Sequence, residues 1–152
     1  MPKINKFQIG SWITIPNEII VEIFTQFKFD FHVIDLEHSI ISSEQAENLI
    51  RIIKLSQSKV IVRSTNNDEY QIKRILDSGA DGLILPNIKN LNQLNKICNF
   101  IFYPPKGDRG VGLSRSSLYG LNFKNYFKKI NNEIDLIIII ENKEAVENID
   151  EI

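Results

Sequence analysis

The sequence lacks several features that would assign a protein to a class at once. Its single cysteine, Cys98, has no partner for a disulfide within the chain, which is typical of proteins from a reducing compartment. Lys and Arg number 18 against 19 Asp and Glu, a net charge of -1, so no basic surface for nucleic acid or anionic lipid is indicated. The longest apolar run, residues 136–140, is too short to cross a bilayer, and no leader pattern opens the chain. We therefore expect a cytoplasmic protein without nucleic-acid or membrane partners.

Five short runs rich in Ile, Val and Phe predict strands. Most are apolar on both faces, as a parallel sheet covered by helices requires. Segments with helical periodicity lie between the first four runs and after the fourth, and Ser42 or Ser43 is the expected N-cap of the second helix. This alternation predicts one α/β domain over residues 1–152. The strands are expected at 8–14, 31–36, 59–63, 82–86 and 135–140, and the helices at 16–27, 42–55, 67–79, 90–102 and within 116–130.

The spacing of the strands favours a (β/α) barrel. No G-x-G-x-x-G motif follows any predicted strand, which argues against a nucleotide-binding sheet. The glycines of GDRGVG, residues 107–112, follow Tyr103-Pro104-Pro105 instead, and we interpret them as a loop. Because an eightfold barrel takes about 250 residues, the sequence predicts an incomplete TIM-type barrel with about five of its eight strands.

Polar or aromatic residues stand at the carboxyl ends of the predicted strands. Trp12 is in the first, Asp35-Leu36-Glu37-His38 ends the second, Arg63 the third, and Glu141 the fifth. Reactive groups of such barrels gather at this end, so these side chains predict one site. Each residue has a structural alternative as a cap, a surface ion pair or a first-turn acid. His32 lies inside its strand and is expected to be packed or hydrogen-bonded, without a chemical role.

Asp77 stands near the end of the third predicted helix. An acid at that position opposes the helix dipole. It is either a surface carboxylate or the partner of a specific group, and His38 is the candidate considered.

Several segments of the sequence resemble, in order and spacing, the HpcH/HpaI aldolases, the metal-dependent class II pyruvate aldolases. The resemblance covers essentially the whole chain but only the first part of the family's fold. It implies a barrel of the phosphoenolpyruvate/pyruvate kind and a lyase that cleaves 4-hydroxy-2-oxo acids into pyruvate and an aldehyde. The segments are GSWITIPN, FDFHVIDLEHS, VIVRS, IKRILDSGADGLILP, YPPKGDRGVGLSR with LYG, and IIENKEAVENIDEI.

The resemblance also implies roles for individual residues. His38 would be the catalytic base, and Asp77 would hold its other ring nitrogen. Arg63 would bind the substrate and stabilise the enolate oxygen, and Trp12 would line the mouth. Glu141 would be one ligand of a divalent ion such as Mg²⁺, Mn²⁺ or Co²⁺ that chelates the 2-oxo acid.

The sequence departs from the family pattern in two places. The second carboxylate ligand of the family lies in a Gly-Pro-x-Asp-Leu-Ser segment, which would fall beyond Ile152. Ile139 stands where the family usually has a Gln that contacts substrate. The loop at 107–110 would cover the mouth or lie at a subunit contact. We expect the 152-residue chain to be impaired on its own, unless more chain, a homo-oligomer or a complementing polypeptide completes the barrel.

Two other functions are open at this stage. The chain could be a truncated, non-catalytic remnant or partner subunit. It could also be a carbon–carbon lyase acting on CoA thioesters, of the citrate-lyase β type, which shares the barrel. The DLEH and YPPxGxRG patterns favour the aldolase.

Overall fold

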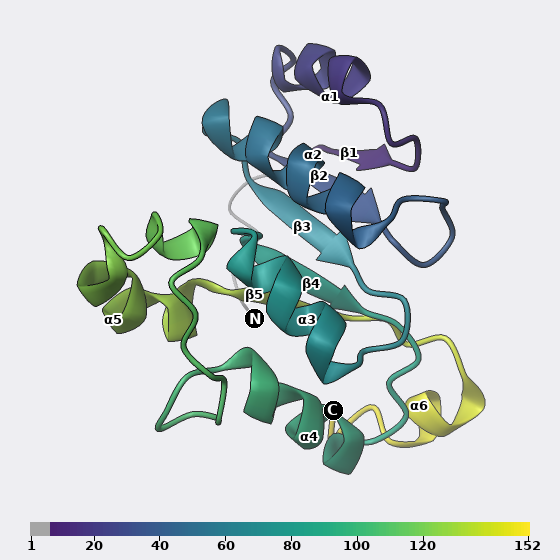
Figure 1. Ribbon diagram of the computed structural model, residues 1–152. Coiled ribbons are helices and arrows are strands. Elements are labelled where there is room, and N and C mark those ends of the chain that lie inside the picture. The colour runs from purple at the N-terminus through teal and green to yellow at the C-terminus, as the bar shows by residue number, and fades with distance from the viewer. Residues whose placement is uncertain (1–6) are drawn as a thin grey trace.

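The computed structural model describes residues 7–152, in which strands and helices alternate along the chain (Figure 1). The described strands pair into one sheet. They are β1 (Gly10–Ile13), β2 (Phe31–Asp35), β3 (Val60–Arg63), β4 (Gly82–Leu85) and β5 (Asp135–Ile138). The helices are α1 (Glu18–Thr25), α2 (Ser43–Leu55), α3 (Glu69–Asp77), α4 (Leu91–Ile101), the 3₁₀ helix η1 (Arg115–Ser117), α5 (Phe123–Glu133) and α6 (Lys143–Glu147).

The order of strands in the sheet is the order in the chain, β1-β2-β3-β4-β5, and each neighbouring pair is parallel. A doubly wound sheet reverses its order at a switch point, whereas a (β/α) barrel keeps one direction around the ring. The predicted barrel-type α/β architecture is therefore confirmed, with β1 and β5 as the edges among the described residues.

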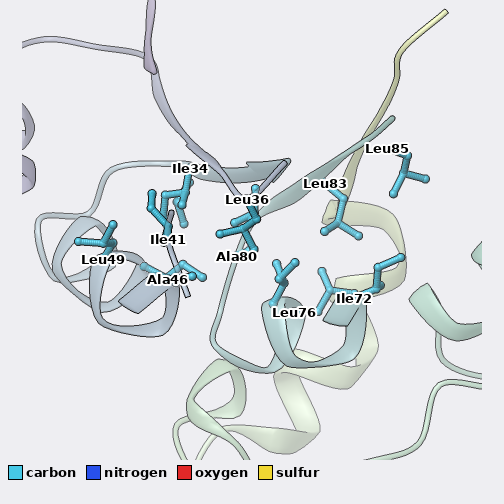
Figure 2. Close-up of a cluster of buried hydrophobic side chains, with 14 of the residues drawn as sticks. Ile34, Leu36, Ile41, Ala46, Leu49, Ile72, Leu76, Ala80, Leu83 and Leu85 are labelled. Atoms are coloured by element: carbon cyan, nitrogen blue, oxygen red, sulfur yellow. The ribbon is translucent and has the colours of Figure 1, made fainter. Parts of the chain in front are cut away.

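The main core lies between the sheet and the helices on one of its faces. Figure 2 shows side chains of β2 and β4 pointing toward those of α2 and α3. Each fully buried Leu or Ile side chain stabilises the fold by about 1.5–3 kcal/mol relative to an exposed one. The residues labelled there are Ile34, Leu36, Ile41, Ala46, Leu49, Ile72, Leu76, Ala80, Leu83 and Leu85, all less than 10% exposed.

Local signals in the sequence fix the ends of α2 and α3. Ser42 is the N-cap of α2 and forms a capping box with Gln45, each side chain accepting from the other's backbone N–H, so two orphan donors of the first turn are satisfied. Asp68 caps α3 through the N–H of Gln71. Gly79 follows the end of α3 with a φ of +99°, a left-handed conformation that glycine adopts without steric cost.

A smaller apolar cluster lies on the other face of the sheet. Val33, Ile61 and Ile84 are buried together, with Ile139 packed against them. Because side chains alternate between the two faces of a strand, residues two positions further along β2 and β3 project from this same face. The side chains of the candidate site, Asp35 and Arg63 among them, lie there, at the carboxyl edge of the sheet.

The region after α4 differs from the expected single helical stretch. A short η1 and the longer α5 replace it, separated by a turn in which Leu118 and Tyr119 have positive φ angles of 52° and 55°. Residues 107–112 form a loop, as predicted. Within residues 7–152, no helix is long and apolar enough to cross a membrane.

Candidate functional site

Asp35 and Arg63 form the centre of the candidate site. They are register partners at the carboxyl ends of the adjacent parallel strands β2 and β3. Arg63 Nε donates to Asp35 Oδ1 at 2.8 Å and Arg63 Nη2 donates to Asp35 Oδ2 at 2.5 Å. The side chains are 15% and 2% exposed, so a two-point pair between planar groups holds the guanidinium in one orientation.

Trp12 of β1 adds a third side chain to this pair. Its indole Nε1 donates to Asp35 Oδ2 at 3.3 Å, and the guanidinium carbon of Arg63 lies 5.3 Å from the centre of the Trp12 ring. The ring is half exposed, so it forms a wall of the candidate site. A cation over an aromatic face adds a favourable electrostatic contact.

Asp35 also shapes the turn that carries His38. Its Oδ1 accepts the backbone N–H groups of Glu37 at 2.9 Å and His38 at 3.2 Å, in the manner of an Asx turn. The imidazole of His38 is 73% exposed, and its Nε2 lies 3.8 Å from Glu37 Oε2. The turn thus presents a water-accessible imidazole at the rim of the candidate site.

Glu37 completes the ion-pair network. Its Oε2 lies 3.3 Å from Arg63 Nη1, close enough for ion pairing but without the angles of a hydrogen bond, since this buried oxygen has no hydrogen-bond partner among the described residues. The contact between Glu37 and Arg63 is therefore electrostatic. The guanidinium of Arg63 therefore interacts with two carboxylates, that of Asp35 at the end of β2 and that of Glu37 in the following turn.

The pKa values of the central pair follow from these contacts. Burial alone would raise the pKa of the Asp35 carboxyl, but the hydrogen bonds from Arg63, from Trp12 and from the backbone N–H groups of His38 and Glu37 outweigh burial and lower it to about 2. The pKa of Arg63 is raised, first by the hydrogen bond to Asp35 and also by the nearby charges of Glu37 and Glu141. Arg63 thus stands as a fixed positive charge at this edge.

Glu141 follows β5 and joins the same edge of the sheet. Its Oε1 accepts the backbone N–H of Asn87, from the segment after β4, at 2.6 Å, and its residue is exposed. An exposed carboxylate is a suitable ligand for Mg²⁺, which is usually held by one or two carboxylates together with water and substrate. Residues 7–152 contain no group of three His, Cys, Asp or Glu side chains that would hold a metal by themselves, so Glu141 fits as one ligand and not as a complete site.

The expected contact between Asp77 and His38 is not formed within this chain. Asp77 Oδ1 accepts from Arg109 Nη2 at 2.6 Å instead. The physical reason is the direction of α3, which runs from the carboxyl end of β3 back to the start of β4 and so places its last residue at the opposite edge of the sheet from His38. The prediction of an intrachain Asp77–His38 pair is therefore wrong.

The loop at 107–110 does not cover the mouth within this chain. Backbone N–H groups of Asp108 and Arg109 donate to the carbonyl oxygens of Asn99 and Phe102, at the end of α4. The Arg109 side chain is fully buried and stacks at 4.7 Å over the ring of Tyr103. The loop is thus held at the amino edge together with Asp77, away from Arg63.

His32 and Ile139 add no hydrogen bond to the candidate site. His32 projects from the opposite face of β2 from Asp35, and its Nε2 has no hydrogen-bond partner among residues 7–152. His32 is fully buried, its Nδ1 lies 2.6 Å from Ser11 Oγ, and burial lowers its pKa, so the expectation of a packed, hydrogen-bonded histidine is confirmed. Ile139, at the position of the family's glutamine, packs on the apolar cluster of Val33, Ile61 and Ile84. It cannot replace the hydrogen bonds of an amide.

From the sequence, Asp35 had no individual role at the end of the second predicted strand. In the structure its carboxylate accepts hydrogen bonds from Trp12 of β1, from Arg63 of β3 and from the turn after β2. The signal available was its position at the end of an apolar strand, beside a second strand ending in Arg63. The register that makes them partners is a property of the folded sheet.

Comparison with known proteins places this arrangement in a family. The sequence profile of the HpcH/HpaI aldolase/citrate lyase family matches residues 8–152. A hydroxypyruvate/pyruvate aldolase of Sagittula stellata is 32% identical over 146 residues, and a 2-keto-3-deoxy-L-rhamnonate aldolase of Escherichia coli is 30% identical over 147.

The solved structures agree with the sequence comparison. The crystal structure of an HpcH/HpaI aldolase from Desulfitobacterium hafniense superposes with a TM-score of 0.85 at 28% identity, covering 96% of this chain and 57% of that one. The two aldolases above are matched over 95% of this chain but only 57% and 55% of their own lengths. The chain thus spans about half the length of these relatives and forms an incomplete barrel that corresponds to the N-terminal part of the family's fold. It belongs to the HpcH/HpaI aldolase/citrate lyase family.

Proposed function

We propose that this chain contributes the proton-transfer and enolate-binding part of an aldolase site that cleaves 4-hydroxy-2-oxo acids into pyruvate and an aldehyde. The two-point pair of Arg63 and Asp35 at the carboxyl edge is the observation that carries the proposal. Family membership and the aldolase activity named for the similar proteins support it.

The chemistry needs a positive charge where the enolate forms. Breaking the bond between carbons 3 and 4 of the oxo acid leaves an electron pair that is delocalised onto the 2-oxo oxygen. Arg63, already oriented by Asp35, stabilises this developing charge without rearrangement during the reaction. Trp12, over the guanidinium, restricts access of water from one side.

His38 is the group proposed to move the proton. In the cleavage direction its imidazole takes the proton of the 4-hydroxyl group as the bond between carbons 3 and 4 breaks, and the enolate then gains a proton at carbon 3 to give pyruvate. In the reverse direction the imidazole removes a proton from carbon 3 of pyruvate, and the alkoxide formed on the aldehyde carbon is protonated. Its exposure at the rim, 73% for the side chain, gives a substrate direct access. Asp77 does not act on His38 from within the same chain, because it is bonded to Arg109.

Glu141 is proposed to hold a divalent ion, Mg²⁺, Mn²⁺ or Co²⁺. Such an ion, when bound, polarises the 2-oxo group of the substrate as a Lewis acid. In this chain, the hydrogen bond from the Asn87 N–H holds the Glu141 carboxylate at the same edge of the sheet as Arg63.

Exchange of the methyl protons of pyruvate with D₂O, followed by ¹H NMR, tests the proposal on this chain, because this half-reaction needs no aldehyde. We expect exchange above the buffer rate with Mn²⁺ present, and its loss in His38→Ala. A matched control is Ser43→Ala, an exposed position in the first turn of α2, which should retain it. Exchange that is equal in the wild type and in His38→Ala would contradict the assignment of the base. Aldol cleavage itself is measured by the release of pyruvate from a 4-hydroxy-2-oxo acid.

A further inference from the structure

Ser11 and His32 form a polar pair inside the apolar layer between the sheet and its helices. They are register partners on β1 and β2, and His32 Nδ1 lies 2.6 Å from Ser11 Oγ. Both side chains project from the helix-covered face, two positions before Ile13 and Ile34 of the main core. The two residues are 7% and 0% exposed, and the pair lies on the other face of the sheet from Asp35 and the candidate site.

The second ring nitrogen of His32 lacks a polar partner. Its Nε2 is buried and makes no hydrogen bond within residues 7–152. The ring of Phe29 stands edge-on to the imidazole, with 5.6 Å between the ring centres, and Phe24 of α1 lies 6.2 Å from Phe29. Beside the Ser11 hydroxyl, the side chains in contact with this imidazole are therefore aromatic.

No charged side chain of the described residues pairs with His32. The ring forms no ion pair there, and burial lowers its pKa. Asp30, two positions earlier, accepts the backbone N–H of Ile9, and β1 carries no charged residue. The other charged residues on the surrounding elements are Lys28 before β2, Lys59 before β3, Arg63 of β3, Glu18 and Glu22 of α1, and Glu44, Glu47, Arg51 and Lys54 of α2.

Protonation changes the groups that this pair has to bury. A neutral imidazole carries one N–H and one acceptor nitrogen, and its Nδ1 is satisfied by the Ser11 hydroxyl whichever of the two donates. The imidazolium carries two N–H groups and a positive charge, which leaves the Nε2–H of His32 without an acceptor. An unpaired charge is costly to bury. The closed interface between β1 and β2 therefore favours the neutral ring.

The first strand and helix are the part of the fold that can respond. Within residues 7–152, β1 is an edge strand with β2 as its single partner, and α1 contains one buried residue, Val21. Segments with few buried apolar contacts open at the lowest cost in free energy. Trp12 follows Ser11 on β1 and donates to Asp35, so separation of β1 would also remove a wall of the candidate site.

We propose that the Ser11–His32 pair is a pH-sensitive switch, which keeps β1 and α1 packed on β2 while the ring is neutral and lets them separate when the ring is protonated. The inference does not rest on the proposed function, because it concerns a buried pair away from the candidate site. It makes the position of Trp12, and with it the shape of that site, dependent on mild acid.

The sign follows from proton linkage. Burial lowers the pKa of His32 in the closed form, whereas an opened segment binds the proton with the ordinary pKa of 6.5. The closed form therefore has its full stability above that ordinary value and loses it progressively as the pH falls below it.

Acrylamide quenching of the fluorescence of Trp12, the single tryptophan of the sequence, measures the opening in untagged protein. Between about pH 8 and about pH 5, where histidines titrate, the quenching constant should rise in the wild type. The rise should be lost in His32→Leu. His38→Ala is the matched control, because it removes the other of the two histidines at an exposed position, and it should retain the rise.

A second measurement keeps the test independent of how well His32→Leu folds. In His38→Ala the remaining histidine Cε1–H resonance belongs to His32, and its ¹H NMR titration should have the same midpoint as the rise in Trp12 quenching. A flat quenching profile in the wild type, an equal rise in His32→Leu, loss of the rise in His38→Ala, or titration of His32 without a change in quenching would each overturn the inference.

Discussion

Asp35 and Arg63 are register partners on neighbouring parallel strands, and two hydrogen bonds of 2.8 and 2.5 Å join their side chains. The same carboxylate accepts the Trp12 indole N–H and the N–H groups that open the turn to His38. One carboxylate therefore fixes the orientation of the guanidinium, the position of the Trp12 ring and the path of the chain toward His38.

Asp35→Asn should lower the free energy of unfolding by about 3 kcal/mol, the lower end of the cost of breaking a buried ion pair, because Arg63 keeps its charge but loses the carboxylate. Urea denaturation followed by circular dichroism measures the change. The control is Asp68→Asn, since asparagine is as good an N-cap as aspartate and the cap to Gln71 is retained. A cost for Asp35→Asn no larger than that of the control would show that the pair does not hold the edge together.

Stability should depend on acid pH through Asp35. Its pKa is lowered from 3.8 to about 2 in the folded chain, so its contribution is fully present above the unfolded pKa and is lost as pH falls through about 2. At about 1.4 kcal/mol per pKa unit, the loss between pH 5 and pH 2 corresponds to about 2 kcal/mol. The wild type should therefore lose that much more stability than Asp35→Asn over this range. If the free energy of unfolding fell equally with pH in the two proteins, carboxylates other than Asp35 would be responsible for the acid sensitivity.

The fold could be predicted because it depends on patterns that are local in sequence. Apolar runs on both faces of β2 and β3, the capping box at Ser42 and the glycine after α3 each carry their own physical reason. The grouping of Trp12, Arg63 and Glu141 at one edge followed from the same rule, since the carboxyl ends of parallel strands meet.

The pairings between side chains could not be predicted in the same way. Whether Asp35 faces Arg63 depends on the register of two strands that are 28 positions apart. The contact expected between Asp77 and His38 failed for a reason contained in the predicted fold itself, because a helix between parallel strands ends at the opposite edge from the strand it follows. Arg109 was then the available partner, supplied by a loop whose position no periodic pattern specifies.

Asn67→Ala should destabilise the protein by more than Asn67→Gly does. Both variants lose the bonds to Pro86 and Ser64, but glycine adopts a φ of 58° freely, whereas alanine carries a left-handed penalty of about 1–2 kcal/mol. Thermal unfolding of the two variants measures the difference. If alanine were the milder substitution, backbone conformation would not be what fixes the segment after β3.

Asp77→Asn and Arg109→Met should have unequal effects although they break the same contact. Asp77→Asn leaves a guanidinium that is 0% exposed without its carboxylate, and its Nε and Nη1 already have no partner among residues 7–152, so a cost of about 3–5 kcal/mol is expected. Arg109→Met removes the buried charge and keeps an unbranched apolar side chain over Tyr103, while the Asp77 carboxylate, 31% exposed, remains in contact with water. Its cost should stay below about 2 kcal/mol. Urea denaturation of both single variants and the double variant measures the asymmetry, and in the double variant most of the cost of Asp77→Asn should disappear. Equal costs for the two single changes would mean that the fold does not depend on neutralising the Arg109 charge.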